Sequence, residues 1–345
     1  MMNKRLADGW LTTVLILSVY AWTMSLATQR SQLEWRDPSP HAARFANVGR
    51  LRLHYLDWGG QGNVLLFLPG LGQSAHIFDG LAPHFTSHHR VLGLTLRGQG
   101  KSDRPESGYD TATLVDDLQG FLDTQHISTV SLISHSMSGN QATEFARRYP
   151  QRVKKLIYIE AAYDFTKMPG PDRDPLQMET PREADLKSVA AGMRWFERVF
   201  GFSSAAVEAD TRDVNLKPDG TLTLEPTPHE VARQLWQGMI SYTPQYHLIA
   251  APILAIYALS ESHPFLSTDS TPDDREKANR FWRSEFVPYQ KHSIAQLLDS
   301  RGPLRIVVLR NTKHLCFIAK EDEAQVVAAM NSFLKIASKT EARTD

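Results

Sequence analysis

The chain has 345 residues, 42% of them hydrophobic and 22% charged, which is enough to bury a large core in one domain with a substantial insertion. Its 38 basic and 38 acidic residues cancel, so no excess charge marks it for nucleic acid or for an anionic membrane surface. We therefore expect a small-molecule substrate and no nucleic-acid partner. The single cysteine, Cys316, excludes an intrachain disulfide and a cysteine-based zinc site.

The N-terminal segment has the pattern of an export signal. A basic Asn3-Lys4-Arg5 stretch precedes a mostly apolar run over residues 10–22, and small residues follow at Ser25-Leu26-Ala27. We predict a signal peptide over residues 1–27, with an uncleaved membrane anchor or a buried core helix as alternatives. A cleaved signal peptide and an uncleaved anchor would both place the body of the chain outside the cytoplasm, in the periplasm or secreted. The polar, proline-bearing residues 28–42 are then a linker.

Strand-like and helix-like patterns alternate after the linker. Several short apolar runs fit strands that are buried on both faces, and two segments between them carry apolar residues at helical spacings of three and four. This alternation predicts an α/β fold, with a mostly parallel central sheet flanked by helices. The strands are expected at 51–56, 64–68, 91–94, 130–133 and 153–159, with a hairpin turn at 47–50, and the helices at 111–125 and 141–149.

A serine-rich turn follows the strand predicted over residues 130–133. Strand, tight turn and helix in this order are the setting of a nucleophile elbow, whose usual pattern has glycine two residues before and after the nucleophile. Here those positions are Ser134 and Ser138, so the side chains are small but the glycine pattern fails. Only Ser136 has small residues on both sides at this spacing, which makes it the candidate nucleophile. The alternative is that Ser136 merely caps the following helix.

Other segments, in the same order, resemble the α/β-hydrolase family and its capped group of esterases, epoxide hydrolases, dehalogenases and proline iminopeptidases. Residues 68–74 resemble the His-Gly-x-Gly loop, with Pro69 in place of histidine. Residues 97–103 resemble the Arg-Gly-x-Gly-x-Ser segment, with Thr95 where Asp is usual. The loop at 311–314 resembles the family's Gly-His loop. The resemblance runs from about residue 51 to 334 and implies a core at 43–163 and 251–345, with a mainly helical cap at 164–250.

This resemblance also implies roles for particular residues. His314 is the expected general base, and the backbone amides of Leu71 and Met137 are the expected oxyanion donors. Gly70 and Gly72 are expected to let the backbone approach the substrate. A surface-loop histidine and a plain glycine turn are the alternatives for these positions.

The acid that would orient His314 has two candidates. Glu160 ends the strand at 153–159, and some branches of the family place their acid there. Glu261 follows a strand at 253–257, near the commoner position of the acid. We favour Glu160 and keep Glu261 as the alternative, since either could be a solvated acid at a strand end or in a loop.

The cap is expected to contain two helices that open at Thr180-Pro181 and Thr227-Pro228, on either side of a hairpin turn at 217–220. A third helix should open at Thr271-Pro272. We predict that apolar side chains of the cap helices roof a substrate pocket, with ordinary core packing as the alternative. These side chains are Phe196, Phe200, Trp236 and Met239.

The candidate nucleophile narrows the expected chemistry. The epoxide hydrolases and dehalogenases of this resemblance attack with Asp, so Ser136 indicates acyl transfer instead. We predict a serine hydrolase that cleaves a small ester or related acyl bond through an acyl-enzyme, with no metal and no cofactor, and with activity that falls when His314 is protonated. The alternatives are an amide or peptide hydrolase of the proline iminopeptidase type and an inactive binding protein of the same fold. The oligomeric state is left open.

Overall fold

The computed structural model describes residues 35–170, 180–225, 227–264, 266 and 271–335. The predicted signal segment at 1–27 and the start of the predicted linker lie outside the described residues. In the described ranges, the search for a helix of sufficient length and apolar character to cross a bilayer found none.

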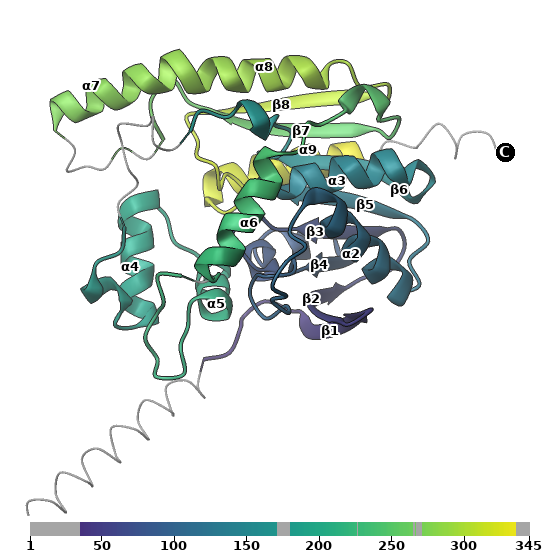
Figure 1. Cartoon of the computed structure of the whole chain (residues 1–345), viewed down its shortest axis with the longest axis horizontal. Coiled ribbons are helices and arrows are strands. Elements are labelled where there is room, and N and C mark those ends of the chain that lie inside the picture. Colours follow the sequence, from purple (N-terminus) through teal and green to yellow (C-terminus); the bar gives the residue numbers. More distant parts are fainter. Residues whose placement is uncertain (1–34, 171–179, 226, 265, 267–270, 336–345) are drawn as a thin grey trace, which may run out of the picture.

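The centre of the molecule is one eight-stranded sheet with the order β1-β2-β4-β3-β5-β6-β7-β8 (Figure 1). β2 pairs antiparallel with β1 and β4, and every other neighbouring pair is parallel, which confirms the predicted α/β class. The predicted hairpin turn joins β1 to β2. The strands are β1 (Ala42–Val48), β2 (Leu51–Gly59), β3 (Val64–Leu68), β4 (Arg90–Leu94), β5 (Val130–His135), β6 (Val153–Ile159), β7 (Ile253–Leu259) and β8 (Leu304–Arg310).

Each face of the sheet is covered by its own layer of helices. Side chains alternate along a strand, so Leu66 and Leu132 enter one core while Leu65 and Ile133 enter the other. The first core lies under α2 (Thr111–Thr124), α3 (Ser138–Arg148) and α8 (Val287–Leu297), and the second under α9 (Lys320–Leu334) and the 3-10 helices η1 (Ala75–Phe78) and η2 (Ala82–Phe85). Because both faces are buried, all six residues of β5 are buried.

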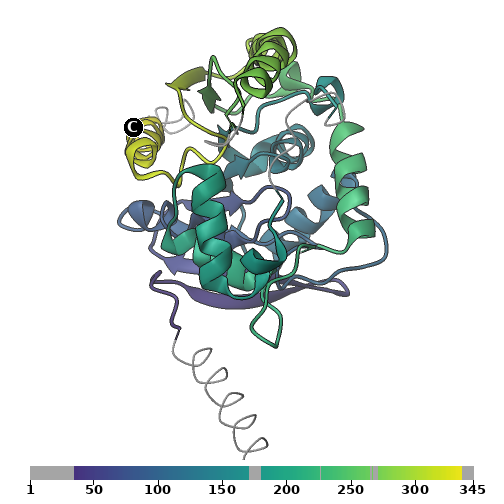
Figure 2. The same ribbon diagram turned by 90° about the vertical axis from the view of Figure 1, so that its left-hand side faces the viewer.

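The segment between β6 and β7 supplies helices that lie over the carboxyl ends of the parallel strands (Figure 2). Lys313 Nζ donates to the Phe200 carbonyl at 2.7 Å, and Asn140 Nδ2 donates to the Met239 carbonyl at 2.9 Å. These bonds tie α4 to the loop that follows β8, and α6 to the first turn of α3. The helices are η6 (Glu183–Leu186), α4 (Val189–Phe200), α5 (Ala205–Val214) and α6 (His229–Ile240), while the short helices η3 (Pro150–Arg152), η4 (Phe165–Lys167) and η7 (Tyr246–Leu248) flank β6 and β7.

The helix starts differ in part from those predicted. No α-helix opens at Thr180-Pro181, because Asp185 accepts the Arg182 N–H and closes a 3-10 turn there; α4 begins only at Val189, where Ser188 caps it. α6 begins at His229 without a side-chain cap, and α5 had no prediction. α7 (Pro272–Phe281) opens as predicted, with Thr271 accepting the Asp274 N–H. A π-helical turn, η8 (Trp282–Phe286), then joins it to α8. The proposed division at residues 164 and 250 stays a prediction.

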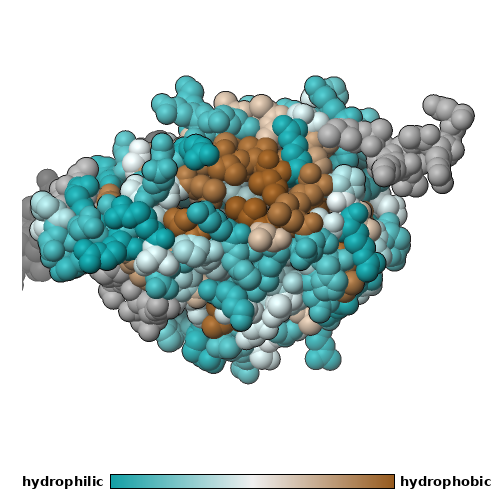
Figure 3. Space-filling view, turned by 90° about the horizontal axis from the view of Figure 1, so that it is seen from above, coloured by the Kyte–Doolittle hydropathy of each residue, from teal (hydrophilic) through white to brown (hydrophobic). Residues whose placement is uncertain are grey.

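The side of the molecule that carries α8 and β8 has an apolar patch on its surface (Figure 3). β8 is the last strand of the sheet and has no neighbour on its outer edge within the described residues. Val308 on this strand is 39% exposed, and Leu298, just after α8, is 63% exposed. This patch is separate from the site described next.

Candidate active site

The turn after β5 holds Ser136 in a backbone conformation that is rare for a residue with a side chain. Its φ is +55°, in the left-handed region. Glu160, after β6, and Asn311, after β8, have φ values of +52° and +57°, so three of the four non-glycine residues with positive φ in the described chain lie in loops that meet here. Strained backbone of this kind is concentrated at functional sites.

Two residues explain why the turn is tight without the usual glycines. Ser138 is buried, its Oγ accepts the His135 N–H at 3.1 Å, and it lies 2.8 Å from the Leu68 carbonyl oxygen. The closest approach is instead at Gly139, where an added Cβ would lie 1.9 Å from the Ala161 carbonyl oxygen. Gly139 is therefore the position at which a side chain would not fit. The Ser138 hydroxyl donates to the Leu68 carbonyl and so links the turn to β3.

The loop after β8 brings His314 to the loop after β6. His314 Nδ1 lies 3.1 Å from Glu160 Oε2, and 37% of the histidine side chain is exposed against 6% for the glutamate. The buried carboxylate is fully hydrogen-bonded, because its Oε1 accepts the Ala258 N–H at 2.6 Å and the Tyr163 hydroxyl at 2.7 Å. Such bonds offset the cost of burying its charge.

Tyr163 is one residue of this network that the sequence analysis did not identify. Burial and the charge of Glu160 raise the pKa of the Tyr163 phenol well above its ordinary value, so the phenol keeps the proton that it donates. Gln290 of α8 in turn lies 3.3 Å from the Tyr163 oxygen. The only signal in the sequence was the spacing of Tyr163 three residues after Glu160.

Glu261, the alternative acid, does not reach the same place. Its side chain is exposed, and no hydrogen bond within the described chain joins it to His314. β7 ends at Leu259, so the loop that carries Glu261 turns outward, whereas the backbone N–H of Ala258 in β7 supports Glu160. The geometry therefore favours Glu160 over Glu261.

The predicted oxyanion donors lie on two loops beside Ser136. The Gly70 N–H is occupied by Gln73 Oε1 and the Gly72 N–H by Gln99 Oε1. The N–H groups of Leu71 and Met137 donate to no other group in the described part of the chain. An added Cβ on Gly70 would lie 3.0 Å from the Ser136 Cβ, so glycine is needed there for the two loops to approach.

A cavity of about 270 Å³ joins these groups. Ser136, Glu160 and His314 line it together with Leu71, and Trp236 and Met239 of α6 line it as predicted for substrate contact. The remaining wall is largely aromatic and aliphatic, and it contains no Lys or Arg among the described residues. Its other members include Phe165, Met168, Trp282, Phe286 and Tyr289.

Two predicted substrate contacts lie elsewhere. Phe196 and Phe200 line a second cavity of about 650 Å³, together with Gly72, rather than the cavity at Ser136. The two rings stack on each other with centroids 4.3 Å apart, and Phe202 adds a third ring. The two rings therefore lie outside the lining of the cavity at Ser136, and their predicted contact with substrate stays a prediction.

Comparison with known proteins identifies the family to which this fold belongs. A family model described as the alpha/beta hydrolase fold matches residues 63–287, more than half of the chain. The chain belongs to the α/β-hydrolase family. It is 28% identical over 118 residues to a 2-(acetamidomethylene)succinate hydrolase of Mesorhizobium japonicum, covering 34% of this chain and 42% of that relative. It is 35% identical over 112 residues to epoxide hydrolase 4 of Mus musculus, covering 32% of this chain and 31% of the relative. The matches span less than half the length of these relatives.

Solved structures of α/β hydrolases extend the likeness to nearly the whole chain. The crystal structure of E-2-(acetamidomethylene)succinate hydrolase has a TM-score of 0.64 at 18% identity, covering 86% of this chain and all of the other. A carboxylesterase from Bacillus subtilis has a TM-score of 0.55 at 17% identity, covering 91% and 98%. At these identities the likeness shows the fold alone. The family and the names of the relatives support a hydrolase.

This α/β hydrolase also has a buried histidine beside the candidate base that the sequence analysis did not single out. The rings of His135 and His314 lie 4.6 Å apart. Burial, with the neighbouring His314 ring, lowers the pKa of His135 well below its ordinary value, so the ring is neutral. Its Nε2 lies 3.2 Å from the His314 carbonyl oxygen, and its Nδ1 lies 3.0 Å from Gln73 Oε1. His135 thereby holds the loop that presents His314.

Proposed function

We propose that this α/β hydrolase is a serine hydrolase that cleaves a small, uncharged ester through an acyl-enzyme on Ser136. The observation that carries the proposal is the buried, fully hydrogen-bonded Glu160 at 3.1 Å from His314, beside a cavity that Ser136 also lines. Nucleophile, base and acid then follow the chain order that is usual in this fold. Serine rather than aspartate at the turn favours acyl transfer over epoxide or haloalkane chemistry.

The reaction starts with the attack of Ser136 Oγ on the substrate carbonyl carbon, while its proton passes to His314 Nε2. Glu160 holds the imidazole with the Nδ1 proton toward the carboxylate and stabilises the imidazolium that forms. The N–H groups of Leu71 and Met137, which have no other partner in the described chain, are the donors for the oxyanion. Collapse of the tetrahedral species expels the alcohol, which takes the proton from His314.

Water completes the cycle by the same route. His314 accepts a proton from the water that attacks the acyl carbonyl carbon, and the second tetrahedral species releases the carboxylic acid. Ser136 recovers its proton from His314, so no metal or organic cofactor is needed for the balance of atoms and charge. Activity is expected to fall at acidic pH, because a protonated His314 cannot accept the serine proton.

The wall of the cavity indicates the substrate class. Apolar side chains such as Trp236 and Met239 suit an aliphatic or aromatic acyl group. A dicarboxylate such as the named substrate of the succinate hydrolase relative needs cationic partners, and no Lys or Arg lines the described wall. We therefore place a neutral ester ahead of an anionic amide. We also place it ahead of a substrate with a free amine, because among the described residues of the wall the one acidic side chain is Glu160, which is already engaged.

The N-terminal pattern supports export as part of the same proposal, with the hydrolase acting in the periplasm, secreted, or tethered by an uncleaved anchor. The experiment that tests the proposed function is a panel of p-nitrophenyl esters and matching p-nitroanilides. We expect turnover of butyrate and longer neutral esters, with anilides and dicarboxylate esters far slower. Turnover of the anilides at a higher rate than the esters would instead support amide hydrolysis, and no turnover of either would support a binding protein.

A further inference from the structure

A second cluster of histidine and carboxylate side chains lies outside the proposed active site. Asp37 and His41 belong to the segment that precedes β1, and His76 and Asp79 belong to η1 and its end. One ligand atom from each of the four lies within 4.8 Å of all the others. The two halves of the cluster therefore join the N-terminal segment to the helix that follows the Leu71 loop.

Four distances within the cluster, of 2.8 to 3.4 Å, lie near the edge length of a coordination tetrahedron. His76 Nδ1 lies 2.8 Å from Asp79 Oδ2 and 3.1 Å from Asp37 Oδ2. His41 Nε2 lies 3.4 Å from both His76 Nδ1 and Asp37 Oδ2, and 3.8 Å from Asp79 Oδ1. Four ligands at the usual zinc–nitrogen and zinc–oxygen distances stand roughly 3.3 Å apart. The Asp79 carboxylate faces His76 with Oδ2 and His41 with Oδ1, so it would have to turn for one oxygen to bind the ion.

Each carboxylate of the cluster has one oxygen held by a hydrogen bond from a group outside the cluster, as carboxylates that bind metal ions commonly have. Asp37 Oδ1 accepts the Ser39 N–H at 2.9 Å, which leaves Oδ2, a buried atom without a hydrogen-bond partner, toward the two histidines. Asp79 Oδ1 accepts the Trp58 indole N–H at 3.1 Å, which leaves Oδ2 toward His76. One oxygen of each acid is thus fixed by a donor while the other faces the centre.

The charge of the cluster calls for a cation. Both acids are largely buried, and their charged partners in the described chain are the two histidines, with no Lys or Arg among them. With neutral imidazoles the group carries two negative charges, which one divalent ion balances. The adjoining trio of His54, His76 and Asp213 is a weaker candidate, because Lys101 already pairs with Asp213 at 2.7 Å.

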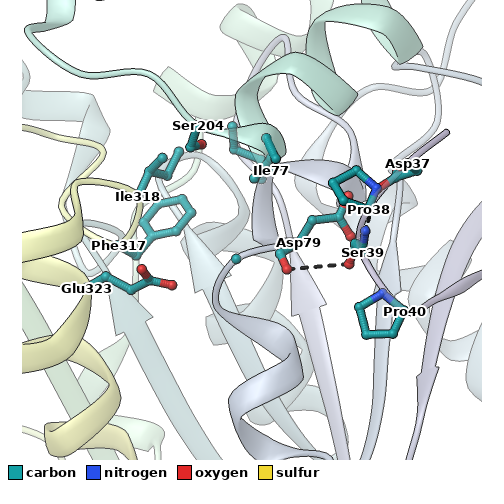
Figure 4. A pocket seen from close by; sticks show the side chains of 13 residues that line it. Asp37, Pro38, Ser39, Pro40, Ile77, Asp79, Ser204, Phe317, Ile318 and Glu323 are labelled. Atoms are coloured by element: carbon teal, nitrogen blue, oxygen red, sulfur yellow. Dashed lines mark hydrogen bonds between the residues drawn. The ribbon is translucent and has the colours of Figure 1, made fainter. Parts of the chain in front are cut away.

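The two acids of the cluster, but neither of its histidines, line a neighbouring cavity. Asp37 and Asp79 line a cavity of about 230 Å³ that also contains Phe317 and Glu323 (Figure 4). In this view the two acids lie on either side of Ser39, with Glu323 across the cavity.

We propose that Asp37, His41, His76 and Asp79 form a four-coordinate site for a divalent transition-metal ion, Zn²⁺ in the first place, which clasps the N-terminal segment to η1. Imidazole nitrogen and carboxylate oxygen are a donor set that suits Zn²⁺. Binding would displace the proton of His76, because the hydrogen bonds to Asp37 and Asp79, against the effect of burial, raise the pKa of this histidine to about 10. The expectation of no metal, drawn from the sequence, did not consider these four residues together. The site is independent of ester hydrolysis.

The test is competition for Zn²⁺ between the full chain, stripped with EDTA, and a chromophoric chelator. We expect one equivalent to bind, and we expect the Asp37→Asn/His41→Ala double variant to bind at least about 100-fold more weakly. Glu323→Gln is the matched control, because this acid lines the same cavity without belonging to the cluster, and it should bind as the wild type does. Equal binding by the double variant would overturn the site.

Cobalt gives a second readout that uses only the wild-type chain, in case the double variant does not fold. Co²⁺ in the four-coordinate site should show the strong visible bands of tetrahedral cobalt, and added Zn²⁺ should remove them in a one-to-one titration. The weak bands of six-coordinate cobalt, or no change on adding Zn²⁺, would contradict the proposal. Reaction of Ser136 with a fluorophosphonate is not expected to depend on either ion.

Discussion

The two histidine–carboxylate clusters of this molecule use the same contact in different surroundings. His314 Nδ1 lies 3.1 Å from Glu160 Oε2, and His76 Nδ1 lies 3.1 Å from Asp37 Oδ2. The first histidine is 37% exposed and faces a cavity, whereas the second is 8% exposed and faces a second acid. Glu160 Oε1 accepts two further donors and its Oε2 faces His314, whereas Asp37 Oδ1 accepts one donor and its Oδ2 faces both histidines of the cluster.

The difference indicates which cluster can move protons and which can hold an ion. A general base needs one supporting acid and an open side from which a substrate can approach. An ion site needs several inward-facing lone pairs and closure from water. The distance from histidine Nδ1 to the carboxylate oxygen, which is the same in both clusters, would not by itself distinguish these roles.

The largest expected effect is at the open cluster. His314→Gln should lower kcat/KM for a p-nitrophenyl ester by about 10⁴-fold, because no other group can take the Ser136 proton. His292→Gln, at an exposed position on α8, is the control and should leave the rate unchanged. A loss of less than about tenfold in His314→Gln, in a folded sample, would remove His314 from the proposed mechanism.

The next effect separates the two acids. Glu160→Gln keeps an oxygen for the Ala258 and Tyr163 donors but places an amide N–H against His314 Nδ1, which favours the wrong tautomer. We expect kcat to fall roughly 10²- to 10⁴-fold with KM little changed. Glu261→Gln, on the exposed loop, should retain full activity. The opposite result for the pair would mean that Glu261 orients the histidine.

A smaller effect should distinguish the two cavities. Trp236→Ala removes part of the apolar wall beside Ser136 and should raise KM for a long acyl ester about tenfold, which corresponds to roughly 1.4 kcal/mol of lost contact. Phe196→Ala, in the second cavity, should change KM much less. KM should be measured for both variants with esters of two-carbon and eight-carbon acyl groups. Only the longer acyl group reaches the apolar wall, so only its KM should rise. Equal effects from both substitutions would show that the cavities act as one.

The smallest effect concerns the contact between α5 and the loop before η1. Asp210 of α5 accepts both the N–H and the hydroxyl of Ser74, at 2.7 and 2.8 Å. Burial raises its pKa to about 7 from the ordinary value of 3.8, despite these bonds. The folded chain therefore holds this proton more tightly than the unfolded chain does, so the free energy of unfolding should fall as the pH rises from about 4 to about 7.

Asp210→Asn preserves the acceptor and removes this titration. In buffer containing EDTA, the drop in urea midpoint between about pH 5 and about pH 8 should be smaller in the variant than in the wild type. Asp219→Asn, in an exposed turn, should leave the drop unchanged, since hydrogen bonds from Thr221 lower the pKa of that acid and keep it ionised over this range. An identical drop in Asp210→Asn would show that Asp210 is ionised throughout.

Much of the fold could be predicted from the sequence, because buried parallel strands give short apolar runs and turns give glycine, proline and serine. The position of Ser136 after β5 followed from this pattern alone, whereas the resemblance supplied His314. The choice between Glu160 and Glu261 could not be made with the same certainty, since each follows one of two neighbouring strands. What separates them is the support from Ala258 and Tyr163, which is a matter of packing.

The cap was harder to predict for a related reason. An amphipathic pattern shows that α4 buries one face, but not what covers it, so the sequence could not show that Phe196 and Phe200 line a different cavity from the one at Ser136. The start at Thr180 was misplaced because Arg182 and Asp185 close a local turn first. The cluster of Asp37 with His76 joins segments far apart in the chain, and no local pattern marks such a meeting.

The measurement that tests the central claim most directly is intact-protein mass after treatment with a fluorophosphonate. The folded wild type should gain one adduct, and Ser136→Ala should gain none, with Glu160→Gln reacting more slowly than Glu261→Gln. A wild type that gains no adduct, or a Ser136→Ala variant that still does, would contradict the assignment of Ser136 as an activated nucleophile.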